Sequence, residues 1–172
     1  GLGDVYKRQL DARPTAIIGQ NGAGKTTLVK LLKGLLRPEG GVIRFRGEDI
    51  AGRTVASLAA QVGYVFQNPD DQIFRYNVLD EVMFGPLNIG MDEKTAREKS
   101  REALAMTGLA GLEDRNPYDL ELYERKMVAI ASVLAMDPDV LILDEPTIAQ
   151  DVRGRRRIAE IVRTPVSYTH LR

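Results

Sequence analysis

The stretch Gly19-Gln20-Asn21-Gly22-Ala23-Gly24-Lys25-Thr26 decides the fold. It fits the pattern G-x-x-x-x-G-K-[ST], in which glycines let backbone N–H groups turn inward around phosphates. An apolar run at Thr15–Ile18 predicts a buried strand before it, and an apolar-patterned helix is expected over Lys25–Leu35. Because a strand and a helix N-terminus flank the glycines, the stretch predicts a phosphate-binding loop rather than a chance turn.

A second motif joins a continuous apolar run, Val140–Leu143, to two acidic residues directly after it. Such a run is typical of a parallel strand buried on both faces. It would bring Asp144 to the Mg²⁺ side of a phosphate site and place Glu145 where it can polarise an attacking water. Alone, the motif is equally explained by a strand end with solvated carboxylates. Together with the phosphate loop, it predicts nucleotide hydrolysis.

The remaining elements favour an α/β fold with a mostly parallel sheet, because strands alternate with helices. Asp92 is the expected N-cap of a helix over Glu93–Met106, and Gly108 lies just past its end. Further strands are expected over Gly41–Arg46 and Val62–Phe66, and further helices over Ser57–Ala60, Arg125–Met136 and Arg153–Val162.

The composition is that of an ordinary soluble domain: 172 residues, 44% hydrophobic and 28% charged. Lys+Arg and Asp+Glu are both 24, and this balance speaks against a nucleic-acid partner bound through bulk positive charge. Cysteine is absent, which excludes disulfides and thiolate metal sites. No apolar stretch is long enough to span a membrane, so we expect any work at a membrane to require a partner.

One predicted helix carries a basic cluster, formed by Arg153, Arg155, Arg156 and Arg157. A solvated helix face explains such a cluster, and contact with nucleic acid is the alternative. We predict no nucleic-acid partner.

When further motifs are added to the phosphate loop and the acidic pair, the sequence resembles the ATPases of ABC transporters over nearly all of residues 10–164. The matching residues are the loop 19–26, Gln67 after the strand Val62–Phe66, the run Asp144-Glu145-Pro146-Thr147, and Asp151. The resemblance implies a P-loop NTPase core in two parts, residues 10–77 and 128–164. It also implies a helical subdomain inserted at 78–127.

The resemblance implies ATP and Mg²⁺ as ligands. ATP would be bound by Gly19, Gln20, Asn21, Gly22, Ala23, Gly24, Lys25, Thr26 and Thr27. Mg²⁺ would be held by Thr26, Gln67 and Asp144. The catalytic residues would be Glu145, Gln67 and Lys25, with Lys25 reaching the β- and γ-phosphates. Asp151 would cross the interface of an ATPase dimer.

The stretch Phe66–Phe74 resembles the energy-coupling-factor subgroup, which powers uptake of cobalt, nickel or vitamins. A polar turn is the alternative explanation of Asn68–Asp71. The subgroup implies a peripheral ATP-hydrolysing subunit on the cytoplasmic face of the membrane. It would contact a transmembrane coupling subunit near Gln67–Phe74.

The sequence departs from the family where the signature L-S-G-G-Q is expected, because it reads Leu120-Glu121-Leu122-Tyr123-Glu124. In the family, this stretch meets the γ-phosphate held by the opposite subunit, so Glu121, Leu122, Tyr123 and Glu124 are expected at the dimer interface. Leu122 and Tyr123 add bulk where backbone must approach closely, and Glu121 adds charge that repels polyphosphate.

Two explanations of this departure stay open. The chain could belong to an asymmetric heterodimer whose second ATPase subunit has an intact signature, or to a subfamily that builds the contact differently. Two other functions also stay open: a nucleotide-binding regulatory subunit with little hydrolysis, and a soluble ABC ATPase without a transport role.

Both ends of the chain resemble translated sequencing-library adapters, with DVYKRQ at Asp4–Gln9 and VSYTH at Val166–His170. We therefore hypothesise that residues 1–9 and 165–172 are non-native flanks and that the native domain is truncated at both termini. We expect the family's adenine-stacking aromatic and switch histidine to be missing, and this polypeptide alone to be nearly inactive.

Overall fold

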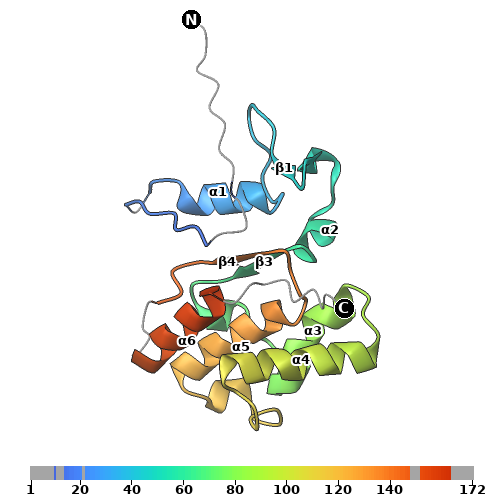
Figure 1. The fold of residues 1–172 in the computed structure, drawn as a ribbon, viewed down its shortest axis with the longest axis vertical. Coiled ribbons are helices and arrows are strands. Elements are labelled where there is room, and N and C mark those ends of the chain that lie inside the picture. The colour runs from blue at the N-terminus through green and yellow to red at the C-terminus, as the bar shows by residue number, and fades with distance from the viewer. Residues whose placement is uncertain (1–9, 11–13, 21, 148–151, 164–172) are drawn as a thin grey trace, which may run out of the picture.

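The computed structural model describes residues 10, 14–20, 22–147 and 152–163. Helix α1 (Lys25–Leu32) and a hairpin of β1 (Arg44–Phe45) and β2 (Glu48–Asp49) form an upper block in Figure 1. Strands β3 (Val62–Val65) and β4 (Val140–Leu143) lie below it. The lower block contains α3 (Val78–Asn88), α4 (Glu93–Thr107), α5 (Leu122–Leu134) and α6 (Val152–Arg163). Connecting elements are α2 (Val55–Ala59) and short 3₁₀ turns at Ile50–Gly52, Pro69–Asp71 and Pro117–Asp119.

Strands β3 and β4 pair in parallel, as the sequence predicts. Val62 lies opposite Val140, and Val65 lies opposite Leu143. The ladder continues into a hydrogen bond of 3.2 Å from the Asp144 amide to the Val65 carbonyl. Because parallel strands end at the same edge, this register brings the residues after β3 beside those after β4.

The hydrophobic core lies among α3, α4 and α5, and α5 is its central helix. Seven consecutive hydrophobic or small residues of α5, from Met127 to Val133, are buried. Other buried members of this core include Val78, Val82, Ala103, Leu104 and Leu109. The same helix packs closely on β3, where a methyl group added to Gly63 would collide with the Val133 side chain.

The bounds of α4 follow from capping. Asp92 accepts a hydrogen bond of 3.0 Å from the Thr95 amide, and Gly108 ends the helix in the left-handed region at φ 80°. The prediction of a helix over Glu93–Met106 is thus confirmed to within one residue. Helix α1 ends at Leu32, three residues earlier than predicted, because Gly34 turns the chain at φ 68°.

The prediction of a buried strand at Thr15–Ile18 is wrong for this structure. These residues are in no strand, and Ile17 and Ile18 are 47% and 93% exposed. A short apolar run becomes a strand only where a neighbouring strand completes its hydrogen bonds, and the described residues of β3 and β4 form a two-stranded sheet. Strand β4 is also less buried than predicted, since Val140 is 37% exposed.

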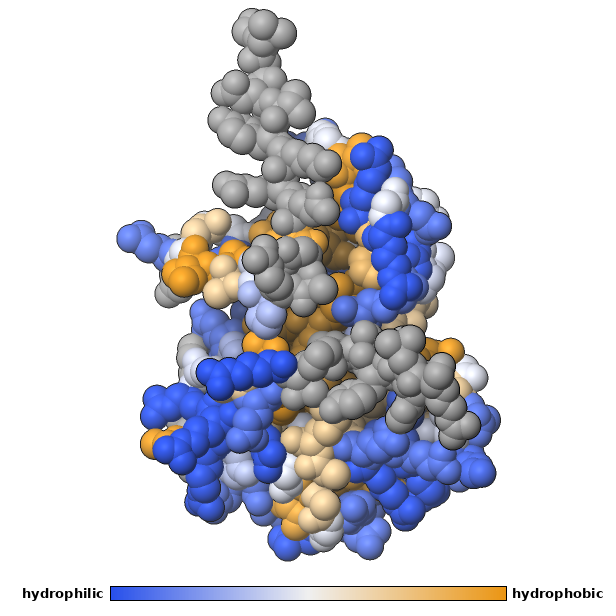
Figure 2. Space-filling model, in the orientation of Figure 1, coloured by the Kyte–Doolittle hydropathy of each residue, from blue (hydrophilic) through white to orange (hydrophobic). Residues whose placement is uncertain are grey.

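The surface differs between the upper and the lower block of the molecule. In Figure 2 the helical lower part is mostly hydrophilic, whereas apolar side chains reach the surface in the middle and upper part. Among the described residues, no helix is long and apolar enough to cross a membrane.

The proposed subdivision of the chain stays a prediction, although its boundary at 127 falls inside α5. The two flanks predicted to be non-native lie outside the described residues.

Candidate functional site

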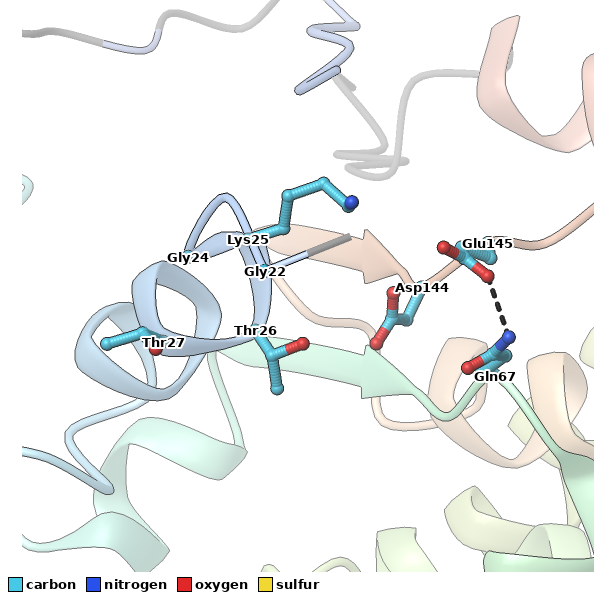
Figure 3. A pocket seen from close by; sticks show the side chains of 8 residues that line it. All are labelled: Gly22, Gly24, Lys25, Thr26, Thr27, Gln67, Asp144 and Glu145. Atoms are coloured by element: carbon cyan, nitrogen blue, oxygen red, sulfur yellow. Dashed lines mark hydrogen bonds between the residues drawn. The ribbon is translucent and has the colours of Figure 1, made fainter. Parts of the chain in front are cut away.

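A cavity of about 440 Å³ lies where the start of α1 faces the carboxyl ends of β3 and β4 (Figure 3). The residues that line it come from segments far apart in the sequence: Gly22, Gly24, Lys25, Thr26, Thr27, Gln67, Asp144 and Glu145. The structure therefore brings the phosphate loop, the glutamine after β3 and the two acids after β4 into one site.

The phosphate loop takes its shape from two glycines in the left-handed region, Gly22 at φ 83° and Gly24 at φ 85°. Gly24 is also the N-cap of α1, so the unpaired amides of the first helical turn begin there. The ammonium of Lys25 folds back on the loop and donates to the carbonyls of Gly19 at 2.8 Å and Gln20 at 3.1 Å. A phosphate that enters the cavity could replace these neutral carbonyls as the acceptor of the Lys25 hydrogen bonds, because hydrogen bonds between charged groups are stronger.

The two carboxylates on the opposite side have different partners. Oδ2 of Asp144 accepts a hydrogen bond of 2.7 Å from the Tyr64 hydroxyl. Oε2 of Glu145 accepts one of 2.7 Å from the side-chain amide of Gln67. Glu145 has a positive φ of 44°, which is uncommon for a non-glycine residue and marks a sharp turn directly after Asp144.

Tyr64 remains a hydrogen-bond donor over a wide pH range. Burial raises the pKa of its hydroxyl far above the ordinary value, and the hydrogen bond and negative charge of Asp144 raise it further. The ammonium of Lys33 lies 4.7 Å from the centre of the Tyr64 ring, and burial lowers the pKa of that lysine. Tyr64 therefore fixes one carboxylate oxygen of Asp144 through this hydrogen bond and leaves the other oxygen for a cation.

The residues present fit a magnesium ion. Figure 3 shows the hydroxyl of Thr26 and the carboxylate of Asp144 directed toward one another across the cavity. Mg²⁺ prefers such oxygen donors and commonly takes one or two carboxylates together with substrate phosphates. Over the described ranges no group of three or more His, Cys, Asp or Glu side chains could hold a metal ion by itself. This donor set suits a metal that arrives with a phosphate ligand.

Other predicted site residues lie elsewhere. Gly19, Gln20 and Ala23 belong to the loop but are not among the lining residues. Asn21 and Asp151 lie outside the described residues. The altered signature stretch, Glu121–Glu124, begins α5 and does not line the cavity. There the Glu121 amide donates a hydrogen bond of 3.0 Å to the Glu124 carboxylate, and Leu122 is 41% exposed.

Two contributors were not predicted as site residues. Strand alternation gives a signal for Tyr64, because it lies opposite Ile142 and therefore on the face that carries Asp144 two residues later. The other is Lys126, whose ammonium donates to the carbonyls of Phe66 and Gln67, each at 2.6 Å. The sequence signal for Lys126 is its position, because it is a charged residue directly before the apolar run that α5 buries.

These features define a domain with the fold of the P-loop class of nucleotide-binding proteins. The family model described as "ABC transporter" matches residues 11–148, and the chain belongs to this family. The solved structure of cbiO1 from Clostridium perfringens, described as part of the ABC transporter complex cbiONQ, superposes with a TM-score of 0.79 and 40% identity. That match covers 88% of this chain and 61% of the other.

Two curated relatives are energy-coupling factor transporter ATP-binding proteins. EcfA1 of Methanospirillum hungatei is 47% identical over 148 residues, which are 86% of this chain and 53% of that protein. EcfA of Methanoculleus marisnigri is 47% identical over 154 residues, which are 89% of this chain and 56% of that protein. The chain thus spans little more than half the length of these relatives.

Proposed function

We propose that this chain is the ATP-binding and ATP-hydrolysing part of a transporter subunit of the energy-coupling-factor type, which powers uptake of a metal ion or a vitamin. One observation carries the proposal: Lys25 and Thr26 share a cavity with Gln67, Asp144 and Glu145. Attack of water on a γ-phosphate uses a charged phosphate loop, an acidic residue for Mg²⁺ and a residue that orients the water, and this cavity offers side chains for each of these roles. The names of the curated relatives support the type of transporter.

In this proposal each side chain has one task. Lys25 places its charge against the β- and γ-phosphates, while Thr26 and Asp144 hold Mg²⁺. The bound Mg²⁺ would neutralise charge on the phosphate oxygens. Glu145 accepts the proton of the attacking water, and Gln67 holds the carboxylate of Glu145 in place through the 2.7 Å hydrogen bond.

The proposal includes two protein partners. One is a second ATPase subunit whose intact signature completes the site, because Glu121–Glu124 of this chain lacks the serine and glycines of that motif. The other is a transmembrane subunit that docks near Gln67–Phe74, where the Phe74 side chain is 50% exposed. These partners would place the chain on the cytoplasmic face of the membrane as a peripheral subunit.

A nucleotide-binding subunit with little hydrolysis of its own is the second candidate. The altered stretch Glu121–Glu124 favours it, because bulky and acidic side chains replace the backbone surface that would approach a phosphate. Under this alternative the cavity would still bind ATP, and Glu145 would contribute little to turnover.

The deciding experiment is isolation of the complex from membranes through an affinity tag on this chain, followed by an assay of ATP hydrolysis. We expect a membrane protein and a second ATPase to be isolated with it, and hydrolysis to stop when EDTA removes Mg²⁺. Isolation of the chain without any membrane protein would refute the transport function. A complex whose hydrolysis is unaffected by Glu145→Gln would support the regulatory alternative.

A further inference from the structure

We propose that Lys126 is a positioning residue that connects the N-terminal end of α5 to the pair Gln67 and Glu145, so that a displacement of the helix changes how Glu145 is held. This inference rests on the proposed ATPase function. It concerns a lysine that contributes no side chain to the cavity lining.

The first observation is the position of the ammonium group. Nζ of Lys126 donates hydrogen bonds of 2.6 Å to two successive carbonyls, those of Phe66 and Gln67. These are the first two residues after β3. The side chain of the same Gln67 donates to Glu145. Lys126 therefore fixes the backbone of the residue that orients the proposed catalytic carboxylate.

The second observation is the burial of this charge. Lys126 is 2% exposed, and over the described residues no carboxylate lies within salt-bridge distance of it. Burial lowers the pKa of its ammonium, and the charge of Asp144 partly opposes this shift. A buried ammonium is costly unless it is well hydrogen-bonded, and an apolar side chain of similar length would fill the same space at lower cost. Stability alone therefore does not account for a lysine here.

The third observation is that the whole segment Phe66–Arg75 is attached to the helical block. Gln72 accepts from the Phe66 amide at 3.1 Å and donates to the Ala129 carbonyl of α5 at 2.8 Å. At the far end, Glu81 of α3 accepts from the amides of Phe74 and Arg75 at 3.0 and 2.8 Å. Two buried side chains of opposite charge thus hold the two ends of the segment, each on a different helix.

Because of these contacts, Gln67 and Glu145 are attached to different elements of the fold. Gln67 is held by α5 through Lys126, whereas Glu145 is the second residue after β4. Lys126 itself is buried, but it lies one helical turn after the exposed Leu122. Leu122 belongs to the stretch Glu121–Glu124, which is expected to meet a second subunit. A push on Glu121–Glu124 would therefore reach Lys126 through a rigid helix and alter the hydrogen bond between Gln67 and Glu145.

The test compares Lys126→Met with Lys94→Met, a control on the exposed face of α4. In the isolated complex we expect Lys126→Met to lower kcat about tenfold, the usual consequence of losing hydrogen bonds from a charged group, with little change in the KM for ATP. In a Gln67→Ala background we expect the same substitution to lower kcat by less than about twofold, because the two effects would not be additive. Lys94→Met should leave kcat unchanged.

Amide hydrogen exchange on the purified chain gives a second, activity-independent measurement. We expect faster exchange in 66–75 for Lys126→Met, and unchanged exchange in α4. Equal losses of kcat in both backgrounds, unchanged kcat, or faster exchange throughout the helical block would overturn the proposal. If the wild-type complex does not hydrolyse ATP, the proposed function fails, and the exchange pattern alone then decides the role of Lys126.

Discussion

The side-chain amide of Gln67 donates a hydrogen bond of 2.7 Å to Oε2 of Glu145, across 78 positions of sequence. The parallel register of β3 and β4 makes this contact possible, because both residues lie just beyond the carboxyl ends of paired strands. The bond orients a carboxylate whose backbone is held at a positive φ. The tests of the site therefore begin with this pair.

Substitution of Glu145 by Gln should abolish turnover while ATP binding is retained. The amide preserves the size of the side chain but cannot accept a proton, and loss of a general base commonly costs about 10²–10⁴-fold in rate. Phosphate release by the isolated complex measures the effect. Glu48→Gln, on the exposed strand β2, is the matched control and should have wild-type turnover.

Substitution of Lys25 by Ala should weaken binding of ATP with Mg²⁺. Loss of a hydrogen bond to a charged phosphate group costs about 1.5–3 kcal/mol, or roughly ten- to a hundredfold in affinity. Titration with a fluorescent ATP analogue measures it, with and without EDTA. Lys30→Ala, on the exposed face of the same helix, keeps the helix and should bind normally. Equal affinity of the two variants would contradict a role for Lys25 in phosphate binding.

Substitution of Gly63 by Ala should destabilise the domain by about 1–3 kcal/mol, the usual cost of overpacking. The added methyl group would collide with Val133 of α5 and approach Pro138. Urea unfolding measures the free energy. Gly52→Ala is the control, because nothing lies within 4 Å of a methyl group placed there. A variant of Gly63 as stable as the control would show that α5 does not pack on β3 in solution.

The cap of α4 should depend on pH. Hydrogen bonds from the hydroxyl and then the amide of Thr95 lower the pKa of Asp92 below its ordinary value of 3.8. Because the ionised form is favoured in the folded state, the stabilisation is complete above pH 3.8. It is lost as the pH falls through the lowered folded pKa. An NMR titration should give that pKa directly, and Asp92→Asn should remove this part of the pH dependence of unfolding.

Restoration of the signature by Glu121→Ser, Leu122→Gly and Tyr123→Gly should raise hydrolysis at the site completed by this chain. The glycines would let backbone approach a phosphate again, and removal of Glu121 would relieve repulsion. The same glycines should destabilise α5 by about 1 kcal/mol each. Hydrolysis by the complex and thermal unfolding of the chain measure the two effects. An unchanged rate would favour a subfamily that builds the contact differently.

Capping and strand patterns allowed much of this fold to be predicted from sequence. Asp92 and Gly108 mark the ends of α4 by local hydrogen bonds, and the apolar runs before Gln67 and Asp144 correctly indicate β3 and β4. Local patterns failed at Thr15–Ile18, because strand formation there depends on a neighbour rather than on the run itself.

The contacts around the site were harder to predict for the same physical reason. The phosphate-loop pattern and the acidic pair identify residues that line the cavity. The hydrogen bonds from Tyr64 to Asp144 and from Lys126 to Phe66 span 80 and 60 positions, however. Their existence depends on strand register and on the packing of α5, which no local sequence pattern specifies.

The hydrogen bond between the Glu121 amide and the Glu124 carboxylate has one more consequence. A helix N-terminus attracts anions through its unpaired amides, and a signature with serine and glycines would leave those amides for a phosphate of the opposite subunit. At the start of α5 the carboxylate of Glu124 already occupies this position, because it accepts the hydrogen bond from the Glu121 amide. A nucleotide held by a partner would therefore have to displace a tethered carboxylate before it could reach this helix.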